Sequence, residues 1–274
     1  MKSEPSIGVP LYDAHNHLQD ERLTPHRGEV LAITRQENIR EMVVNGSCEE
    51  DWPAVLELAQ QFPEVIPSFG YHPWYLRQRS QNWDRVLIGF LEGTRSGVGE
   101  IGLDKWIKDY DLHDQERVFR RQIEIAAERN LPVSIHCLQA WGKLLELLNL
   151  GPRPRCGFVL HSFGGPQEMI EPLTGLGAYF SLPGYFAHER KARQRETFRH
   201  VPRNRLLIET DAPDQSLPLE LVKYALTDPK TGKPVNHPGN LVAVYEFAAE
   251  LLEESLEALA RQVEENFKRL FGHV

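Results

Sequence analysis

Eight short apolar runs, separated by longer amphipathic segments, constrain the fold of this 274-residue chain more than any other feature. The runs begin 21 to 35 residues apart, and most are rich in β-branched or aromatic residues and bounded by Gly, Pro or Asn. The segment 114–130 shows the clearest helical spacing of apolar residues. Strands are predicted over residues 11–17, 42–47, 65–71, 97–103, 132–137, 157–162, 178–182 and 206–211. The chain is therefore an alternation of strands and helices.

This alternation predicts an α/β fold with a parallel sheet, whose helical crossovers cover both faces. The positions of the ionisable residues favour a closed (β/α)₈ barrel of the TIM-like type. In a doubly wound open sheet, which is the alternative, functional residues gather at one switch point. Here histidines or carboxylates end the first, third, fourth, fifth, sixth and eighth runs. Because a closed ring of strands brings six such ends to one mouth, the barrel is the better interpretation.

The domain organisation follows from the absence of a Pro-, Gly- or Ser-rich linker. Residues 1–274 are predicted to form a single barrel domain. The polar, Pro-rich segment 214–237 is predicted to be a long loop over the barrel mouth. Two helices are expected within 238–272, packed on the exterior of the barrel, because apolar residues recur there at helical spacing.

Composition excludes several classes of protein. No apolar run approaches the length of about 20 residues that spans a membrane, and the amino terminus lacks the apolar core of a signal peptide. We therefore expect a cytoplasmic protein with no membrane contact. The three cysteines, Cys48, Cys137 and Cys156, lack CxxC spacing and are expected to be free thiols. A formal net charge of −8 argues against a broad surface for nucleic acid, but it is compatible with a small anionic substrate held by metal.

His15 and His17 form the first candidate metal-binding motif. They lie two residues apart on a predicted strand, so both imidazoles leave the same face and can converge on one cation. Asp13 shares that face by strand alternation. An HxH pair alone is as compatible with two core histidines as with a metal site. The other ligand-type residues at strand ends favour metal.

Glu100 lies between these histidines and those further along the chain. Its flanking residues are apolar, and Gly99 and Gly102 allow a ligand or the backbone to approach closely. A carboxylate at a surface turn is the alternative. A carboxylate that is buried has to be paired or bound to metal, and its two oxygens can bridge two ions.

His136, His161 and Asp211 each follow an apolar run at the predicted mouth. Neutral imidazole is a common ligand of zinc and other transition ions, although either histidine alone is more often structural. Asp211 and Glu209 share a side-chain direction, but Asp211 lies nearer the mouth. We therefore assign Asp211 to the metal and Glu209 to the residues that support the ligands.

Taken in order, these motifs resemble the TatD family of metal-dependent hydrolases, whose best-known members are deoxyribonucleases. The resemblance covers almost the whole chain. It runs through Asp13-Ala-His15-Asn-His17, Gly70-Tyr-His72-Pro, Gly99-Glu100-Ile-Gly-Leu-Asp104, Leu131-Pro-Val-Ser-Ile-His136, Leu160-His161-Ser-Phe-Gly, Leu206-Leu-Ile-Glu-Thr-Asp211-Ala-Pro and Asn266-Phe-Lys-Arg-Leu-Phe271.

The resemblance implies a TIM-like barrel with two divalent metal ions, Mg, Mn or Zn, that hydrolyses phosphodiesters with metal-activated water. One ion would take His15, His17, Glu100 and Asp211, and the other Glu100, His136 and His161. Glu100 would bridge the ions and Asp211 could accept a proton, which makes both residues catalytic.

The resemblance also implies substrate contacts. His72 would hydrogen-bond a phosphate oxygen, and Lys191 could reach phosphate from a loop or helix start. The alternatives are a turn histidine before Pro73 and a solvated helical face around the neighbouring arginines. The expected substrates are DNA ends, single-stranded DNA or a small phosphodiester, and no protein partner is implied.

The chain departs from the family pattern at positions expected to line the substrate cleft. Leu138 and Gln139 replace an Arg and an acidic residue, Ser162 and Gly164 replace a Cys and a Ser, Asp214 replaces an aromatic residue, and Val235-Asn236-His237-Pro238 replaces Arg-Asn-Glu-Pro. The substrate is therefore less well defined than the metal chemistry. A metal-dependent amidohydrolase or lactonase acting on a small carbonyl substrate is the alternative.

Overall fold

A computed structural model of the chain describes residues 8–272 and contains an eight-stranded parallel sheet with strand order β1 to β8. Residues 1–7 and 273–274, at the two ends of the predicted 1–274 domain, lie outside the described residues. The strands are β1 Leu11–Asn16, β2 Ile39–Asn45, β3 Val65–Phe69, β4 Gly97–Asp104, β5 Val133–Leu138, β6 Phe158–Leu160, β7 Ala178–Pro183 and β8 Leu206–Glu209.

The eight predicted strands and the barrel class are confirmed, and the differences lie at strand ends. β2 begins at Ile39, three residues before the predicted start, whereas β6 ends at Leu160 and β8 at Glu209, so that His161 and Asp211 follow their strands rather than close them. Nearly every residue of the eight strands is buried, as expected for a sheet covered on both faces.

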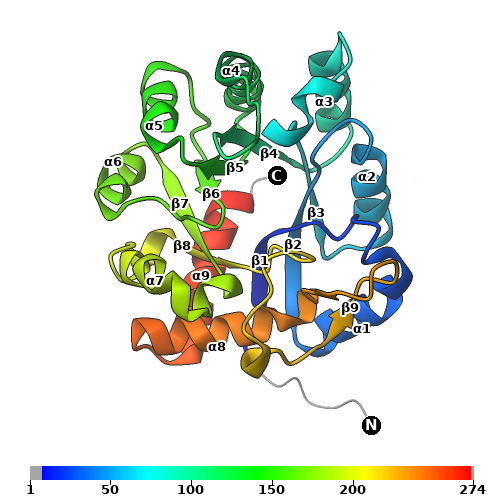
Figure 1. Cartoon of the computed structure of the whole chain (residues 1–274), viewed down its shortest axis with the longest axis vertical. Helices are drawn as coiled ribbons and strands as arrows, with labels where there is room; N and C mark the ends of the chain where they lie inside the picture. The colour runs from blue at the N-terminus through cyan, green and yellow to red at the C-terminus, as the bar shows by residue number, and fades with distance from the viewer. Residues whose placement is uncertain (1–7, 273–274) are drawn as a thin grey trace.

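Helices surround the strands in chain order, as Figure 1 shows for α1 to α8. Their bounds are α1 Arg27–Gln36, α2 Trp52–Gln61, α3 Trp83–Glu92, α4 Leu112–Arg129, α5 Trp141–Leu150, α6 Ile170–Gly175, α7 Ala192–Arg199, α8 Leu241–Leu252 and α9 Leu256–Phe271. α4 begins two residues before the predicted 114–130 helix and ends one residue before its predicted end. The Asp111 carboxylate caps its first turn by accepting from the Asp114 N–H at 3.0 Å, and Asn130 ends it in the left-handed conformation.

The seam between β8 and β1 is closed by individual hydrogen bonds. The N–H of Asp211 donates to the carbonyl of His15 at 2.9 Å, and the N–H of His17 donates to the carbonyl of Ala212 at 2.8 Å. The buried carboxylate of Asp13 accepts from the Thr210 N–H at 2.9 Å and from its hydroxyl at 2.6 Å. Asp13 therefore fastens the last strand to the first.

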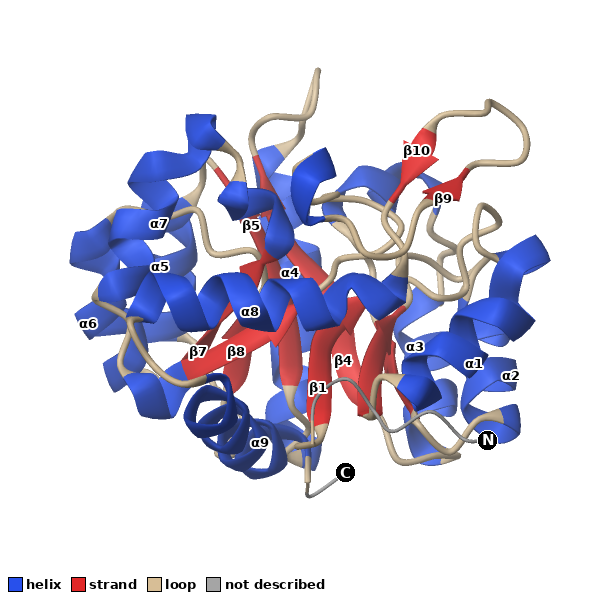
Figure 2. Cartoon of the chain, turned by 90° about the horizontal axis from the view of Figure 1, so that it is seen from below, coloured by secondary structure: helices blue, strands red, loops and turns tan. Residues whose placement is uncertain are grey.

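The carboxy-terminal region contains the two expected helices, α8 and α9. α8 lies along the side of the barrel, whereas α9 lies below the strands in Figure 2, at the opposite end from the β9–β10 hairpin. The amide of Asn266 on α9 donates to the carbonyls of Arg203 and Leu206 at 2.7 and 2.8 Å, where β8 begins. α9 therefore covers the amino-terminal end of the seam.

The segment 214–237 is more structured than the predicted loop. It contains a short 3₁₀ turn, Leu219–Leu221, and the small hairpin of β9 Leu226–Thr227 and β10 Pro234–Val235. Within residues 8–272, no helix combines the length and hydropathy needed to cross a bilayer.

Candidate metal centre

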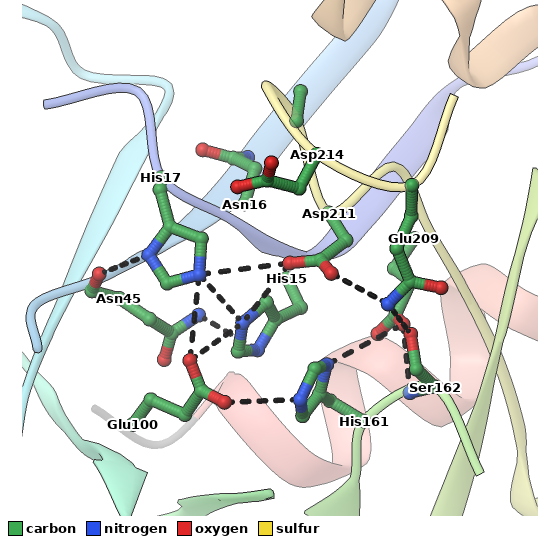
Figure 3. A network of polar contacts seen from close by, with 12 residues as sticks. His15, Asn16, His17, Asn45, Glu100, His161, Ser162, Glu209, Asp211 and Asp214 are labelled. Atoms are coloured by element: carbon green, nitrogen blue, oxygen red, sulfur yellow. Dashed lines mark hydrogen bonds and ion pairs between the residues drawn. The ribbon is translucent and has the colours of Figure 1, made fainter. Parts of the chain in front are cut away.

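The six residues predicted as ligands come together at the barrel mouth, where four of them supply the first cluster of ligand atoms (Figure 3). The Nε2 atoms of His15 and His17 lie 3.3 Å apart, and each lies 3.4 Å from Oε2 of Glu100. Oδ1 of Asp211 lies 3.6 Å from His15 Nε2 and 3.5 Å from His17 Nε2. Ligands about 2.0–2.1 Å from a tetrahedral ion are about 3.3–3.4 Å apart. The five distances are therefore close to those between the ligands of one tetrahedral ion.

The second cluster forms around the other oxygen of the same carboxylate. Oε1 of Glu100 lies 3.2 Å from His136 Nδ1, 3.0 Å from His161 Nε2 and 3.4 Å from His72 Nε2. His136 Nδ1 and His161 Nε2 are 3.2 Å apart. Glu100 thus belongs to both clusters, one through each oxygen.

Two glycines of β4 allow β4 and β5 to approach each other around Glu100. A Cβ at Gly102, whose φ is +157°, would lie 1.9 Å from the carbonyl oxygen of His136. A Cβ at Gly99 would lie 2.7 Å from Cβ of Ser134. The glycines therefore admit neighbouring protein atoms, which is one of the two uses predicted for them.

Two of the histidines turn their second ring nitrogen towards an acceptor. Nδ1 of His17 is 2.8 Å from the Asn45 carbonyl, and Nε2 of His136 is 3.0 Å from Oδ2 of Asp104. Both rings therefore leave the other nitrogen with a lone pair directed into the clusters. Nδ1 of His15 lies 2.8 Å from the Ser134 hydroxyl and 3.1 Å from the Asn45 amide nitrogen, and Nδ1 of His161 lies 3.7 Å from Oε1 of Glu209, beyond hydrogen-bond distance.

His72 has the opposite arrangement. Its Nδ1 accepts a hydrogen bond from the N–H of Trp74 at 3.2 Å, so neutral His72 carries its proton on Nε2, the nitrogen that faces Glu100. Burial lowers the pKa of His72 to about 4, which keeps the ring neutral at pH 7. His72 is therefore a hydrogen-bond donor into the site, although its position beside Glu100 and His136 also resembles a ligand set.

The carboxylates at the centre are ionised although they are buried. Burial alone would raise the pKa of Glu100, but the electrostatic attraction of the surrounding imidazole rings holds it well below its usual range. Burial likewise opposes ionisation of Asp211, whose pKa is lowered to about 2 mainly by its interaction with His17.

Comparison with known proteins agrees with this geometry. Residues 12–272 match the family model described as TatD related DNase. The chain belongs to this family. It is 28% identical to the Escherichia coli 3'-5' ssDNA/RNA exonuclease TatD over 264 residues, which cover 96% of this chain and 99% of that protein. It is also 28% identical to an uncharacterized metal-dependent hydrolase, YabD of Bacillus subtilis, with 95% and 98% coverage.

A solved structure supports both the family and the fold. The crystal structure of YjjV, a TatD homologue from Escherichia coli, superposes with a TM-score of 0.86 at 27% identity and covers 96% of this chain and 98% of its own. As a TatD-family member, the chain is a metal-dependent hydrolase whose candidate ligands are the histidines and carboxylates of the two clusters.

Three supporting residues were not singled out from the sequence. Asp104 lies on β4 four residues after Glu100, and Asn45 and Ser134 lie on the neighbouring strands β2 and β5. Strand alternation places Asp104 on the same face as Glu100, and this was the available signal. Glu209, which was predicted to support the ligands, lies 3.7 Å from Nδ1 of His161, and its carboxylate accepts hydrogen bonds from Ser162 and Ser181.

The positions that depart from the family pattern have different environments. Leu138, Gln139 and Gly164 line one surface pocket, to which α7 contributes Arg193. His237, in contrast, does not line a cleft, and that expectation was wrong. The His237 side chain is 2% exposed and accepts from the N–H of Gly239 at 2.8 Å, because it caps the turn before α8.

Two charged residues near the mouth have partners outside the clusters. Asp214 forms a bidentate ion pair with Arg22, at 2.9 and 2.8 Å. Lys191 follows β7, and its ammonium group lies 4.8 Å from the ring centre of Tyr185 and 5.7 Å from that of Phe186. These rings therefore lie beside the charged end of Lys191, which closes the 3₁₀ turn Glu189–Lys191 between β7 and α7.

Proposed function

We propose that this protein hydrolyses phosphodiester bonds at the ends of single-stranded nucleic acid, with two divalent ions held at the barrel mouth. The single observation that carries the proposal is the Glu100 carboxylate, one oxygen of which belongs to each cluster of ligand atoms. A shared carboxylate is suited to holding two ions close enough to act on one phosphate.

The donor set fits divalent metal ions. His15, His17, Glu100 and Asp211 would hold one ion, and Glu100, His136 and His161 the other. The acceptors behind His17 and His136 support this assignment, because ligand imidazoles usually donate their second N–H to such groups. Imidazole with carboxylate suits Zn, Mn and related ions, and geometry and supply select among them.

The protein residues then have distinct tasks. When bound, divalent ions polarise the phosphate and make water nucleophilic near neutral pH. Asp211, ionised and hydrogen-bonded to the Gln215 amide at 2.6 Å, accepts the proton of the attacking water. His72 donates its Nε2–H to a phosphate oxygen. Lys191 contributes a further positive charge to substrate binding from the loop after β7.

Two observations support single-stranded ends as the substrate class. Several relatives, including the Escherichia coli protein, are named 3'-5' ssDNA/RNA exonucleases. The net charge of −8 disfavours tracking along a long duplex, which depends on a positively charged groove.

The test uses protein stripped of metal with chelator and then supplied with Mg²⁺, Mn²⁺ or Zn²⁺. The substrates are a 5′-labelled single strand, a blunt duplex of the same sequence and a closed circle. We expect progressive shortening of the single strand from its 3′ end, slower attack on the duplex and no nicking of the circle.

Two results would overturn the proposal. Rapid nicking of closed circles would indicate an endonuclease. Hydrolysis of carboxylic esters or lactones by metal-loaded protein that leaves every phosphodiester intact would indicate the carbonyl chemistry of related barrels.

A further inference from the structure

The exposed aromatic side chains of this protein gather on two loops at the barrel mouth. Among residues 8–272, the conspicuously exposed large apolar side chains include three aromatic ones. Trp74 is 59% exposed and follows β3, whereas Trp106 and Tyr110 are 71% and 43% exposed and follow β4. Single exposed aromatic residues need no explanation, but a group of three beside a candidate active site does.

Hydrogen bonds connect both tryptophans to the metal centre through one carboxylate. Oδ2 of Asp104 accepts from Trp74 Nε1–H at 2.7 Å and from His136 Nε2 at 3.0 Å, and Oδ1 accepts from the Trp106 N–H at 2.6 Å. The Trp74 ring also meets the His72 ring edge to face, with centres 5.2 Å apart. The indole of Trp74 is therefore held in place beside the site while more than half of the residue stays exposed.

The two loops are also tied to each other, and the second carries two lysines beside Asp109 and Asp111. The guanidinium group of Arg77 donates to the carbonyl of Asp109 at 2.6 Å, which joins the loop after β3 to the loop after β4. Lys105 and Lys108 alternate with the aromatic residues of the second loop, and in the part of the chain described here neither ammonium group forms an ion pair. Aromatic faces interleaved with lysines are the combination that binds a single strand.

We propose that Trp74 and Trp106 form a stacking platform for the nucleobases next to the phosphate at the metal centre, with Lys105 and Lys108 contacting adjacent phosphates. The inference rests on the proposed function and assigns the residues that select a single strand. Bases in a duplex are already stacked on each other, so only an unpaired end can place its bases on the indole faces.

The experiment measures binding of a fluorescently labelled thymidine hexanucleotide to metal-loaded protein by fluorescence anisotropy, with phosphorothioate linkages that resist hydrolysis. The comparison is an abasic hexamer with the same number of the same linkages. We expect the hexanucleotide to bind more tightly. Because one base stacked on an aromatic ring contributes about 5- to 150-fold to affinity, Trp106→Ala should lower the preference for the hexanucleotide at least about fivefold, and Trp74→Ala/Trp106→Ala should lower it further.

Matched variants separate stacking from other effects. Trp106→Phe and Trp74→Phe keep an aromatic face and should retain most of the preference, although Trp74→Phe loses the hydrogen bond to Asp104. Leu150→Ala removes a side chain that is 70% exposed at the end of α5 and should keep the wild-type preference. Equal binding of both hexamers by the wild type, or an unchanged preference in Trp106→Ala, would overturn the inference.

A chromogenic phosphodiester without bases distinguishes this inference from the proposed reaction. Hydrolysis of that diester without discrimination between the hexamers would refute the platform and leave the reaction standing. Discrimination between the hexamers without cleavage of any phosphodiester would support the platform and refute the reaction.

Discussion

Replacing Glu100 by Gln tests whether one carboxylate serves two ions. Oε2 lies 3.4 Å from both histidines of the first cluster, and Oε1 lies 3.0 and 3.2 Å from those of the second. Glutamine has one oxygen, and its NH₂ group cannot bind a cation. One cluster therefore loses a ligand, and the other exchanges an anionic oxygen for a neutral one.

The size of the effect follows from the ligands that remain. If the amide oxygen stays with the first cluster, His15, His17 and Asp211 complete a weakened site, whereas His136 and His161 alone cannot retain the second ion in competition with water. Metal content should fall from two ions per chain to one or fewer. Losing one ion removes several kcal/mol of charge stabilisation, so we expect kcat/KM for a chromogenic phosphodiester to fall by about a thousandfold or more.

The assay is elemental analysis of protein equilibrated with a stated free concentration of Mn²⁺ or Zn²⁺, combined with the rate measurement. Asp214→Asn is the matched control, because it removes the same unit charge from a carboxylate that is paired with Arg22 rather than with the clusters. Two ions per chain in both variants would show that Glu100 is not a bridge.

Three further changes have separate readouts. Asp104→Asn should weaken binding of one ion by about 10- to 100-fold, since it disturbs the acceptor behind His136; competition with a chelating dye measures this, and unchanged affinity would contradict it. Asp13→Ala leaves three donors without their acceptor, the N–H and hydroxyl of Thr210 and the amide of Asn16, at about 1–3 kcal/mol each. Urea unfolding should therefore show that the free energy of unfolding falls by about 3 kcal/mol or more. A decrease below about 1 kcal/mol would refute the role of Asp13 at the seam. Burial, with repulsion from His26, lowers the pKa of His237 to about 4 from 6.5. Between pH 4 and 6.5 the imidazole of His237 is protonated in the unfolded chain but not in the folded one. The free energy of unfolding should therefore be highest above pH 6.5 and fall by up to about 3 kcal/mol as the pH decreases towards 4. His237→Asn should remove this pH dependence. If the free energy of unfolding changes equally with pH in the wild type and in His237→Asn between pH 7.5 and 4.5, His237 is not its source.

The strands and the site histidines could be predicted because both leave a one-dimensional signal. Each strand is an apolar run, and His136 is a polar residue set within such a run, as is Glu100. His161 and Asp211 lie just after the end of their strands, and their position still indicates where those strands reach the barrel mouth. Spacing along the chain was therefore sufficient to find the fold and the candidate ligands.

Roles that depend on which acceptor faces which atom could not be predicted. Strand alternation places Asp13 on the same face as His15 and His17. Its carboxylate nevertheless accepts hydrogen bonds from Thr210, because β1 and β8 meet without a regular ladder. Asp104 and Glu100 are equivalent by alternation, and only the three-dimensional arrangement shows Asp104 behind His136 rather than beside it. The hairpin of β9 and β10 was missed because two-residue strands have no periodicity to detect.

The seam between β1 and β8 brings together ligands of the first cluster that come from the first and the last strand of the chain. His15 and His17 follow one side of it and Asp211 the other, so during synthesis His17 leaves the ribosome 194 residues before Asp211. A nascent chain that has not completed β8 cannot assemble the proposed four-ligand site. The loop that follows the last strand supplies the last ligand of the first cluster, so this cluster assembles only once the ring of strands has closed.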